Sequence, residues 1–307
     1  MPAIEIRDVT KTFGTHRAVD ALTLAVPEGS IYGFIGPNGS GKTTTIRMIM
    51  NILLLDRGEV SVLGDARPGA TRDRVGYLPE ERGLYRKMKV RRLLRYYGAL
   101  KGATPATVDA EIDFWLERLG LAQWANHRID ALSKGMSQKL QFIAAIVARP
   151  ALVILDEPFS GLDPVNAEAL KDGVLELRRR GATIVFSTHD MAVAERTCDR
   201  IFMIFKGRKV LDGSMEQIQA EYGFDTVRVR TQAGAAALAG LAQVDTSNDY
   251  GNMQEIRVRG DAQALLQQLA ARTTVYHFEI ARPSLHDIFV RIAKPDADPG
   301  TIPAVGH

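Results

Sequence analysis

Cysteine is nearly missing from this chain: Cys198 is the single one among 307 residues, so no internal disulfide can form. One thiol in a chain of this length is typical of a reducing compartment. No run of about 18 apolar residues occurs, because the longest candidate, 143–155, is interrupted by Arg149 and Pro150. The N-terminus also lacks the basic start and apolar stretch of a secretory signal. We therefore expect a cytoplasmic protein, for which a role at a membrane requires a partner.

An excess of charge of one sign is lacking as well. Lys and Arg number 39 and Asp and Glu 36, which leaves a formal net charge of +3. No global field favours nucleic acid, so we expect no nucleic-acid partner. The content of hydrophobic residues, 46%, and of charged residues, 24%, is that of a globular protein and excludes collagen-like and disordered classes. The length suggests two domains.

Periodicity predicts an α/β domain in the first part of the chain. Alternating apolar positions in the first 30 residues predict an antiparallel β layer. The apolar run 31–35, followed by a glycine loop and helical spacing, predicts a strand, a phosphate-type loop and a helix. Helical spacing dominates about 91–150 and predicts a helical subdomain. Two apolar runs, 152–155 and 183–187, flank a helical pattern at 165–180, which predicts a parallel sheet.

A second, smaller domain is predicted after residue 223. A hairpin turning at Lys206 and Gly207 and a helix at 215–222 precede a change in composition, so we divide the chain into 1–223 and 224–294. The order of strands and helices in the second part resembles a split β-α-β unit of ferredoxin type, with its first helix at 235–241. No cluster of ligand residues occurs there, which favours a regulatory or docking module. The tail 295–307, rich in Pro, Asp and Gly, is expected to be disordered.

Residues 36–43 fit the phosphate-loop pattern and lie between a predicted strand and a predicted helix. Glycines allow backbone N–H groups to close around phosphate oxygens, Lys42 can reach the terminal phosphates, and Thr43 offers a hydroxyl to Mg²⁺. The alternative, a glycine turn that only caps a helix, is disfavoured because motif and context agree. We expect ATP to contact Gly36, Pro37, Asn38, Gly39, Ser40, Gly41, Lys42, Thr43 and Thr44.

Two carboxylates, Asp156 and Glu157, end the apolar run 152–155. The carboxyl ends of parallel strands face the ligand in such folds. We predict that Asp156 holds Mg²⁺ and that Glu157 polarises the water that attacks the γ-phosphate. The alternative is that the two carboxylates only cap the N-terminus of a helix. We would favour that interpretation if the sequence had no phosphate loop. Together the two sites predict a nucleotide hydrolase.

Further motifs narrow the family. Residues 132–140, Leu-Ser-Lys-Gly-Met-Ser-Gln-Lys-Leu, resemble the signature motif of ABC ATPases, and residues 160–164, Ser-Gly-Leu-Asp-Pro, are similar to the D-loop of that family. His189 stands at its switch-histidine position and Phe13 at that of the aromatic residue stacked on adenine. The resemblance covers residues 4 to about 220. It implies a P-loop NTPase fold with a RecA-like parallel sheet, an antiparallel β layer and a helical subdomain.

The resemblance also implies a head-to-tail pair of ATP-binding subunits. Ser133 and Gly135 of one subunit would then contact the γ-phosphate bound by Lys42 of the other, and Asp163 belongs to the same interface. An N-cap role of Ser133 is compatible with this assignment. His189 by itself would more often be a structural histidine, but its position after the last parallel strand favours contact with the γ-phosphate.

The sequence departs from the family pattern in two places. Lys134 and Met136 replace Gly and Gln of the usual signature, and Glu80 occupies the position of the glutamine that binds Mg²⁺. We expect Glu80 to keep the metal role, because a carboxylate also accepts from Mg²⁺-bound water. The metal ligands predicted are therefore Thr43, Asp156 and Glu80.

A basic stretch without acidic residues follows Glu80. Three interpretations are open for it: a solvated face, nucleic-acid binding with Tyr85, Tyr96 and Tyr97, and contact with the cytoplasmic helix of a membrane partner or with anionic headgroups. We favour the third, because the family docks its partner in this region. The stretch comprises Arg82, Arg86, Lys87, Lys89, Arg91, Arg92 and Arg95.

We therefore predict the ATP-binding and hydrolysing subunit of an ABC transporter. Its expected partners are a second ATP-binding subunit and a separate transmembrane permease, which would hold this chain at the cytoplasmic face of the cell membrane. The layout is most like that of subunits of the ABC-2 exporter group. A soluble ABC ATPase acting on nucleic acid or ribosomes is the alternative, disfavoured because one phosphate loop occurs and no coiled-coil insertion. A non-hydrolysing homologue is a third, disfavoured by Lys42, Asp156 and Glu157.

Overall fold

The computed structural model describes residues 1–67, 69–81, 83–222 and 226–293, and it divides into two compact units between Ser214 and Met215. This division lies nine residues before the boundary that we expected after residue 223. Helix α7 (Met215–Tyr222) belongs to the second unit because its partners lie there: Gln219 donates from Nε2 to the carbonyl of Pro283 at 3.2 Å. The predicted disordered tail lies outside the described residues.

The predicted antiparallel layer is a three-stranded sheet with the order β2-β1-β4. Strands β1 (Pro2–Phe13) and β2 (His16–Pro27) form the expected hairpin. Strand β4 (Arg57–Val62), which the sequence did not predict, adds to the other edge of β1.

A six-stranded sheet with the order β5-β6-β7-β3-β8-β9 forms the centre of the first unit, and all neighbours are parallel except β8 and β9. Its central strands β6, β7 and β3 are buried throughout because both faces of the sheet are covered. The strands predicted at 31–35, 152–155 and 183–187 are therefore confirmed, as is the hairpin turn at Lys206 and Gly207. The strand bounds are β5 Val75–Leu78, β6 Leu152–Leu155, β7 Thr183–Thr188, β3 Ile31–Ile35, β8 Arg200–Phe205 and β9 Arg208–Gly213.

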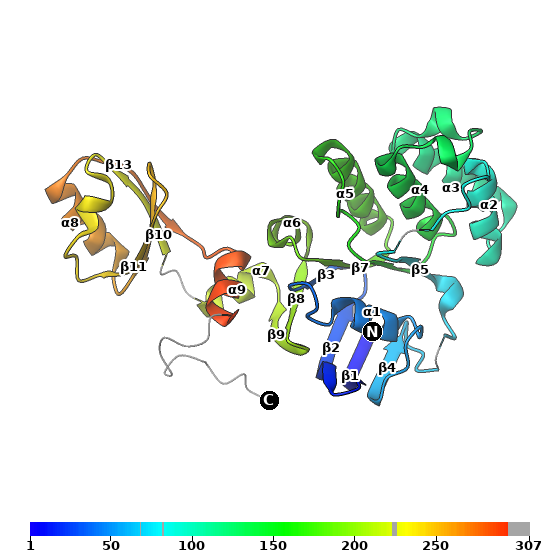
Figure 1. The fold of residues 1–307 in the computed structure, drawn as a ribbon, viewed down its shortest axis with the longest axis horizontal. Coiled ribbons are helices and arrows are strands. Elements are labelled where there is room, and N and C mark those ends of the chain that lie inside the picture. Colours follow the sequence, from blue (N-terminus) through cyan, green and yellow to red (C-terminus); the bar gives the residue numbers. More distant parts are fainter. Residues whose placement is uncertain (68, 82, 223–225, 294–307) are drawn as a thin grey trace. The chain divides into compact units, whose positions relative to one another are not determined.

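Helices cover the two faces of the parallel sheet unequally, as Figure 1 shows: α2 to α5 lie on one face, and α1 with the antiparallel layer on the other. Successive residues of β6 alternate between the two cores, with Val153 and Leu155 toward α2–α5 and Leu152 and Ile154 toward α1. The helix bounds are α1 Lys42–Ile49, α2 Val90–Leu100, α3 Pro105–Arg118, α4 Lys134–Ile146, α5 Pro164–Arg179 and α6 Met191–Thr197.

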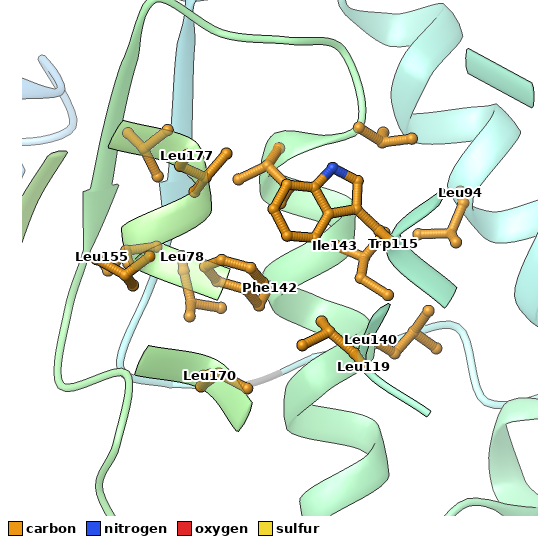
Figure 2. Packing of buried hydrophobic residues seen from close by; sticks show 14 of the residues in the cluster. Leu78, Leu94, Trp115, Leu119, Leu140, Phe142, Ile143, Leu155, Leu170 and Leu177 are labelled. Carbon is orange, nitrogen blue, oxygen red and sulfur yellow. The ribbon is translucent and has the colours of Figure 1, made fainter. Parts of the chain in front are cut away.

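The larger core fixes the helical subdomain. Trp115 of α3 is fully buried and meets Phe142 of α4 edge to face, with ring centroids 5.9 Å apart. Figure 2 shows both rings beside Ile143 and between the sheet residue Leu155 and the α2 residue Leu94. Because this packing holds α4 against the sheet, it also fixes the position of the N-terminus of α4.

The second unit contains a four-stranded antiparallel sheet with the order β11-β12-β10-β13, which is the strand order of a ferredoxin-like fold. The α-helix expected at 235–241 is a shorter 3₁₀-helix, η4 (Gly234–Leu238), and the backbone is already extended at Ala239, with φ −62° and ψ 130°. The other bounds are β10 Thr226–Thr231, β11 Val244–Asp249, β12 Gln254–Val258, α8 Ala262–Arg272, β13 Val275–Ala281 and α9 Leu285–Ala293.

Candidate functional site

Four parallel neighbours of the central sheet, β5, β6, β7 and β3, end at the same edge. Glu80 follows β5, Asp156 and Glu157 follow β6, His189 follows β7, and the phosphate loop follows β3. Residues separated by more than a hundred positions in the chain are thereby brought to one edge, where open α/β sheets bind their ligands.

The phosphate loop has the backbone that an anion-binding loop requires. Gly36, Gly39 and Gly41 have φ angles of 154°, 76° and 112°, a region that favours glycine. The ammonium of Lys42 donates to the carbonyl oxygens of Gly36 at 2.7 Å and Pro37 at 3.1 Å. The loop is therefore curled around the lysine at the start of α1, where unpaired backbone N–H groups and the helix dipole attract anions.

The Lys42 side chain is 6% exposed and its Nζ lies 3.8 Å from Oε1 of Glu157. Burial lowers the pKa of this ammonium, and the nearby carboxylates of Glu157, Asp156 and Glu80 act in the opposite direction. The buried ammonium of Lys42 can transfer its hydrogen bonds from the two carbonyl oxygens to phosphate oxygens, and it can then offset the negative charge of the phosphates.

Asp156 is 1% exposed, and its Oδ1 accepts a hydrogen bond of 2.5 Å from Oγ of Ser187 and one of 3.4 Å from Oγ1 of Thr43. The expected metal ligands Thr43 and Asp156 are thus adjacent. Ser187 also accepts from the backbone N–H of Glu157 at 2.9 Å, so one hydroxyl fixes both acidic residues. The sequence interpretation missed Ser187, although a serine directly after the apolar residues 184–186 of a predicted strand was a usable signal.

Glu157 and His189 are paired: the carboxylate oxygens lie 3.0 and 3.1 Å from Nδ1 of the imidazole. Glu157 has φ 48°, a conformation that is uncommon for a residue other than glycine and that costs about 1 to 3 kcal/mol. The carboxylate is 9% exposed and the imidazole 54%. A nearly buried base oriented by a half-exposed histidine can accept a proton from water at the sheet edge.

The residues present fit ATP and Mg²⁺. Two buried side-chain oxygens at this edge, Oγ of Ser40 and Oδ2 of Asp156, have no hydrogen-bond partner. A buried polar atom without a hydrogen-bond partner destabilises the fold unless a ligand supplies the missing contact. Ser40 lies in the phosphate loop and can donate to a phosphate oxygen, while Asp156 beside Thr43 supplies the hard oxygen donors that Mg²⁺ prefers.

Glu80 and Phe13 are further residues that we expect to contact Mg²⁺ and ATP. Glu80 is exposed, yet its charge is close enough to oppose the effect of burial, which lowers the pKa of Lys42. Phe13 ends β1, is 49% exposed and has the ammonium of Lys11 at 5.6 Å from its ring centroid. An exposed ring of this kind can stack on a base.

Ser133, Gly135 and Asp163 form a second group at the N-termini of α4 and α5. The Ser133 hydroxyl caps α4 by accepting from the N–H of Met136 at 3.2 Å, and Asp163 caps α5 by accepting from the N–H of Asn166 at 3.0 Å. The hydrogen bonds that Asp163 accepts from the backbone and the side chain of Asn166 lower the pKa of its carboxyl group. The contacts of this group thus lie among α4 and α5 and not with Lys42.

Gln138 is a further residue of this region that the sequence interpretation missed. It is 1% exposed, and its Nε2 donates to the carbonyl of Pro158, directly after Glu157. The signal was a glutamine within the buried face of a predicted helix. This hydrogen bond connects the α4 N-terminal segment with the loop that carries the candidate base.

Comparison with known proteins identifies the family. The ABC transporter family matches residues 19–160, and a family described as the C-terminal domain of DrrA1-3-like ATP-binding proteins matches residues 213–293. The chain is 41% identical over 290 residues to YhaQ of Bacillus subtilis (strain 168), described as an uncharacterized ABC transporter ATP-binding protein, covering 94% of this chain and 97% of the relative. It is 32% identical to the Nod factor export ATP-binding protein I of Burkholderia lata, covering 94% and 96%.

Solved structures agree. An ATP-binding subunit of an ABC transporter superposes with a TM-score of 0.68 at 31% identity, covering 72% of this chain and 93% of that one. The protein is an α/β P-loop ATPase, and the chain belongs to the family of ABC transporter ATP-binding proteins, which hydrolyse ATP to power transport. Its full-length relatives include export proteins. Across the residues that the structure describes, we find no helix with the length and apolar character needed to cross a bilayer.

Proposed function

We propose that this chain binds ATP with Mg²⁺ at the sheet edge and hydrolyses it as one of two subunits that power a separate permease, in a complex of the ABC-2 exporter type. The observation that carries the proposal is the convergence of Lys42, Asp156, Glu157 and His189 at the ends of adjacent parallel strands. Each supplies a function that phosphoryl transfer to water requires.

The roles follow from the contacts. Lys42 and the loop N–H groups bind the phosphates, and the hydroxyl of Ser40 adds a donor. Asp156, Thr43 and Glu80 would hold Mg²⁺, and the ion would neutralise phosphate charge. Glu157 accepts the proton of the attacking water, and the imidazole of His189 fixes this carboxylate.

A second copy or a paired subunit would complete the site. Ser133 and Asp163 are exposed at the N-termini of α4 and α5, Gly135 is half-buried in the first turn of α4, and each capping oxygen accepts from one backbone N–H. The first turn of a helix has further N–H groups that can donate to an anion. In a head-to-tail pair, these residues of one subunit would meet the phosphates bound by Lys42 of the other. Each bound ATP would then stabilise the dimer.

The basic stretch that we expected to face the permease needs revision. Arg91 and Arg95 form ion pairs with Asp113 and Asp109 of α3, at 2.5 and 2.7 Å, so acidic residues distant in sequence neutralise them in space. Arg92 is exposed on the same helix. Arg82 lies outside the described residues.

The docking surface that we propose therefore consists of exposed residues only. Its aromatic part is Tyr85, 56% exposed, stacked edge to face on Tyr96 at 5.9 Å. Its basic part comprises Arg86, Lys87, Lys89 and Arg92. Exposed tyrosine and arginine side chains are enriched at protein interfaces, and the four cations add attraction to an acidic helix or to anionic headgroups at the membrane.

The test is co-purification of the full chain from membranes of the cells that make it. We expect a membrane-embedded permease to be recovered, and we expect Arg92→Glu to reduce its recovery without changing ATP binding. Arg57→Glu serves as the control: it reverses an exposed arginine on β4 and also breaks the ion pair of that residue with Asp8, and we expect it to leave recovery of the permease unchanged. Recovery of ribosomes or DNA in place of a membrane protein would reject the transport function, whereas an unaffected Arg92→Glu complex would reject only the docking surface.

A further inference from the structure

The turn between β8 and β9 lies beside the phosphate loop. β8 pairs in parallel with β3 up to Met203 opposite Ile35, and it continues for two residues beyond the point where β3 becomes the loop. Lys206 and Gly207 then reverse the chain with φ angles of 50° and 78°, the pattern of a type I′ turn. A lysine in this conformation is uncommon and indicates that the surroundings constrain the turn.

Gly207 connects two segments of the nucleotide site through its backbone. Its N–H donates to the carbonyl of Ser40 in the phosphate loop at 3.0 Å, and its carbonyl accepts from the N–H of Asp20 in β2 at 2.9 Å. β2 is the second strand of the hairpin whose turn follows Phe13. One residue thus joins the phosphate loop to the hairpin that carries the exposed aromatic ring.

The space around Gly207 excludes a side chain. A β-carbon added there would lie 2.9 Å from the carbonyl oxygen of Ala18, 3.2 Å from its carbonyl carbon and 3.3 Å from the carbonyl oxygen of Arg17. These are backbone atoms of β2, so rotation of a side chain cannot relieve the contact. A substitution would have to move β2 away from the turn.

Ion pairs reinforce the same connection. The carboxylate of Asp20 accepts from Nη1 of Arg17 and from Nε of Arg208, both at 2.8 Å. Arg208 is the first residue of β9, so this carboxylate links β2 to the residue after the turn. The two arginines hold the pKa of Asp20 below its usual range, which keeps the carboxylate ionised.

We propose that Gly207 is a positioning residue for the nucleotide, because it fixes the distance between the hairpin at Phe13 and the phosphate loop. The inference rests on the proposed function, in which Lys42 binds the phosphates of ATP, and on the expectation that the exposed ring of Phe13 stacks on the base. Base and phosphates are joined covalently in ATP, so both contacts form together only if that distance matches. A spacing that is set before binding avoids the entropic cost of arranging two mobile segments.

The experiment compares two probes, Mg²⁺-ATP and Mg²⁺-tripolyphosphate, the second of which lacks a base. In the full chain, Gly207→Ala is expected to weaken ATP binding about tenfold, the effect of losing one base–aromatic stack. Tripolyphosphate is expected to bind as it does to the unchanged chain, because it contacts the phosphate loop alone. Phe13→Ala is the reference and should give the same pattern.

Gly102→Ala is the matched control, because Gly102 has a similar φ of 70° but no atom within 4 Å of an added β-carbon. It carries the same backbone strain without displacing a neighbour, and we expect it to bind both probes normally. Asp20→Ala is the second variant. It removes the ion pairs with Arg17 and Arg208 and adds no atom, and it should weaken ATP binding a few-fold. It decides the question if Gly207→Ala does not fold.

Equal losses for both probes would show that the turn only supports the phosphate loop, and no loss for ATP would show that the spacing is unimportant. Either result overturns the inference. A failure of the proposed function is seen earlier: the unchanged chain would not bind ATP, or Phe13→Ala would leave the preference for ATP over tripolyphosphate unchanged.

Discussion

Glu111 of α3 is the buried charge whose removal should most affect the first unit. The residue is 2% exposed, and its carboxylate accepts from Nε of Arg149 at 2.6 Å, from Nη1 of Arg180 at 2.9 Å and from Nε1 of Trp115 at 2.9 Å. These donors come from the α4–β6 connection, the end of α5 and α3 itself. One carboxylate therefore connects the helical subdomain to the elements that lead into β6 and β7.

The cost of Glu111→Ala can be worked from these contacts. Removing one partner of a buried ion pair typically costs about 3 to 5 kcal/mol. The lower end applies because the Arg149 side chain is 62% exposed and can be hydrated, and Arg180 retains Glu176 and the ring of Phe114. The indole N–H of buried Trp115 loses its acceptor. We expect the free energy of unfolding to fall by about 3 kcal/mol, and by about 1 to 2 for Glu111→Gln, which keeps the shape and one acceptor.

Thermal unfolding of the full chain, followed by calorimetry, measures this effect. For a unit of this size, about 3 kcal/mol corresponds to a decrease in Tm of about 6 to 12 °C. The transition of the first unit should move and that of the second should not. Glu117→Ala on the exposed face of the same helix controls for helix propensity. A decrease of no more than 2 °C for Glu111→Ala, or equal decreases for both variants, would refute the reasoning.

Two further predictions concern the site and the sheet. Glu157→Gln keeps the size of the side chain but removes its basicity, so ATP turnover should fall by about 10² to 10⁴ while ATP binding persists; an unchanged turnover in a steady-state assay would exclude Glu157 as the base. Tyr32, which is buried, donates from its hydroxyl to Asp212 at 2.7 Å, and burial raises its pKa far above the usual value. Because the folded state binds the phenolic proton more tightly than the unfolded state, stability is complete below about pH 10 and decreases as the pH rises above it. Tyr32→Phe should therefore flatten this alkaline decrease in a denaturant titration at several pH values, and an identical pH profile would contradict the assignment.

Local patterns in the sequence were sufficient for most elements of the first unit. The phosphate loop requires glycine at positions with positive φ, such as Gly39 and Gly41, and the spacing of these glycines can be recognised in the sequence. The central strands β3 and β6 are short apolar runs because both faces of the sheet are covered there. Asp156 and Glu157 follow one of these runs, so their approach to Lys42 could be predicted from the rule that parallel strands end at the same edge.

The sequence by itself determined the fold class, the motifs and the residues that form the candidate site, since these depend on local backbone requirements and on spacing. Only the tertiary structure decided what depends on contacts between distant segments: the pairing of Arg91 and Arg95 with α3, the hydroxyl of Ser187 that fixes two carboxylates, and the burial of Glu111. It also decided that Gly207 joins the phosphate loop to β2. Burial and hydrogen-bond partners are properties of the packed chain, and one-dimensional patterns do not contain them.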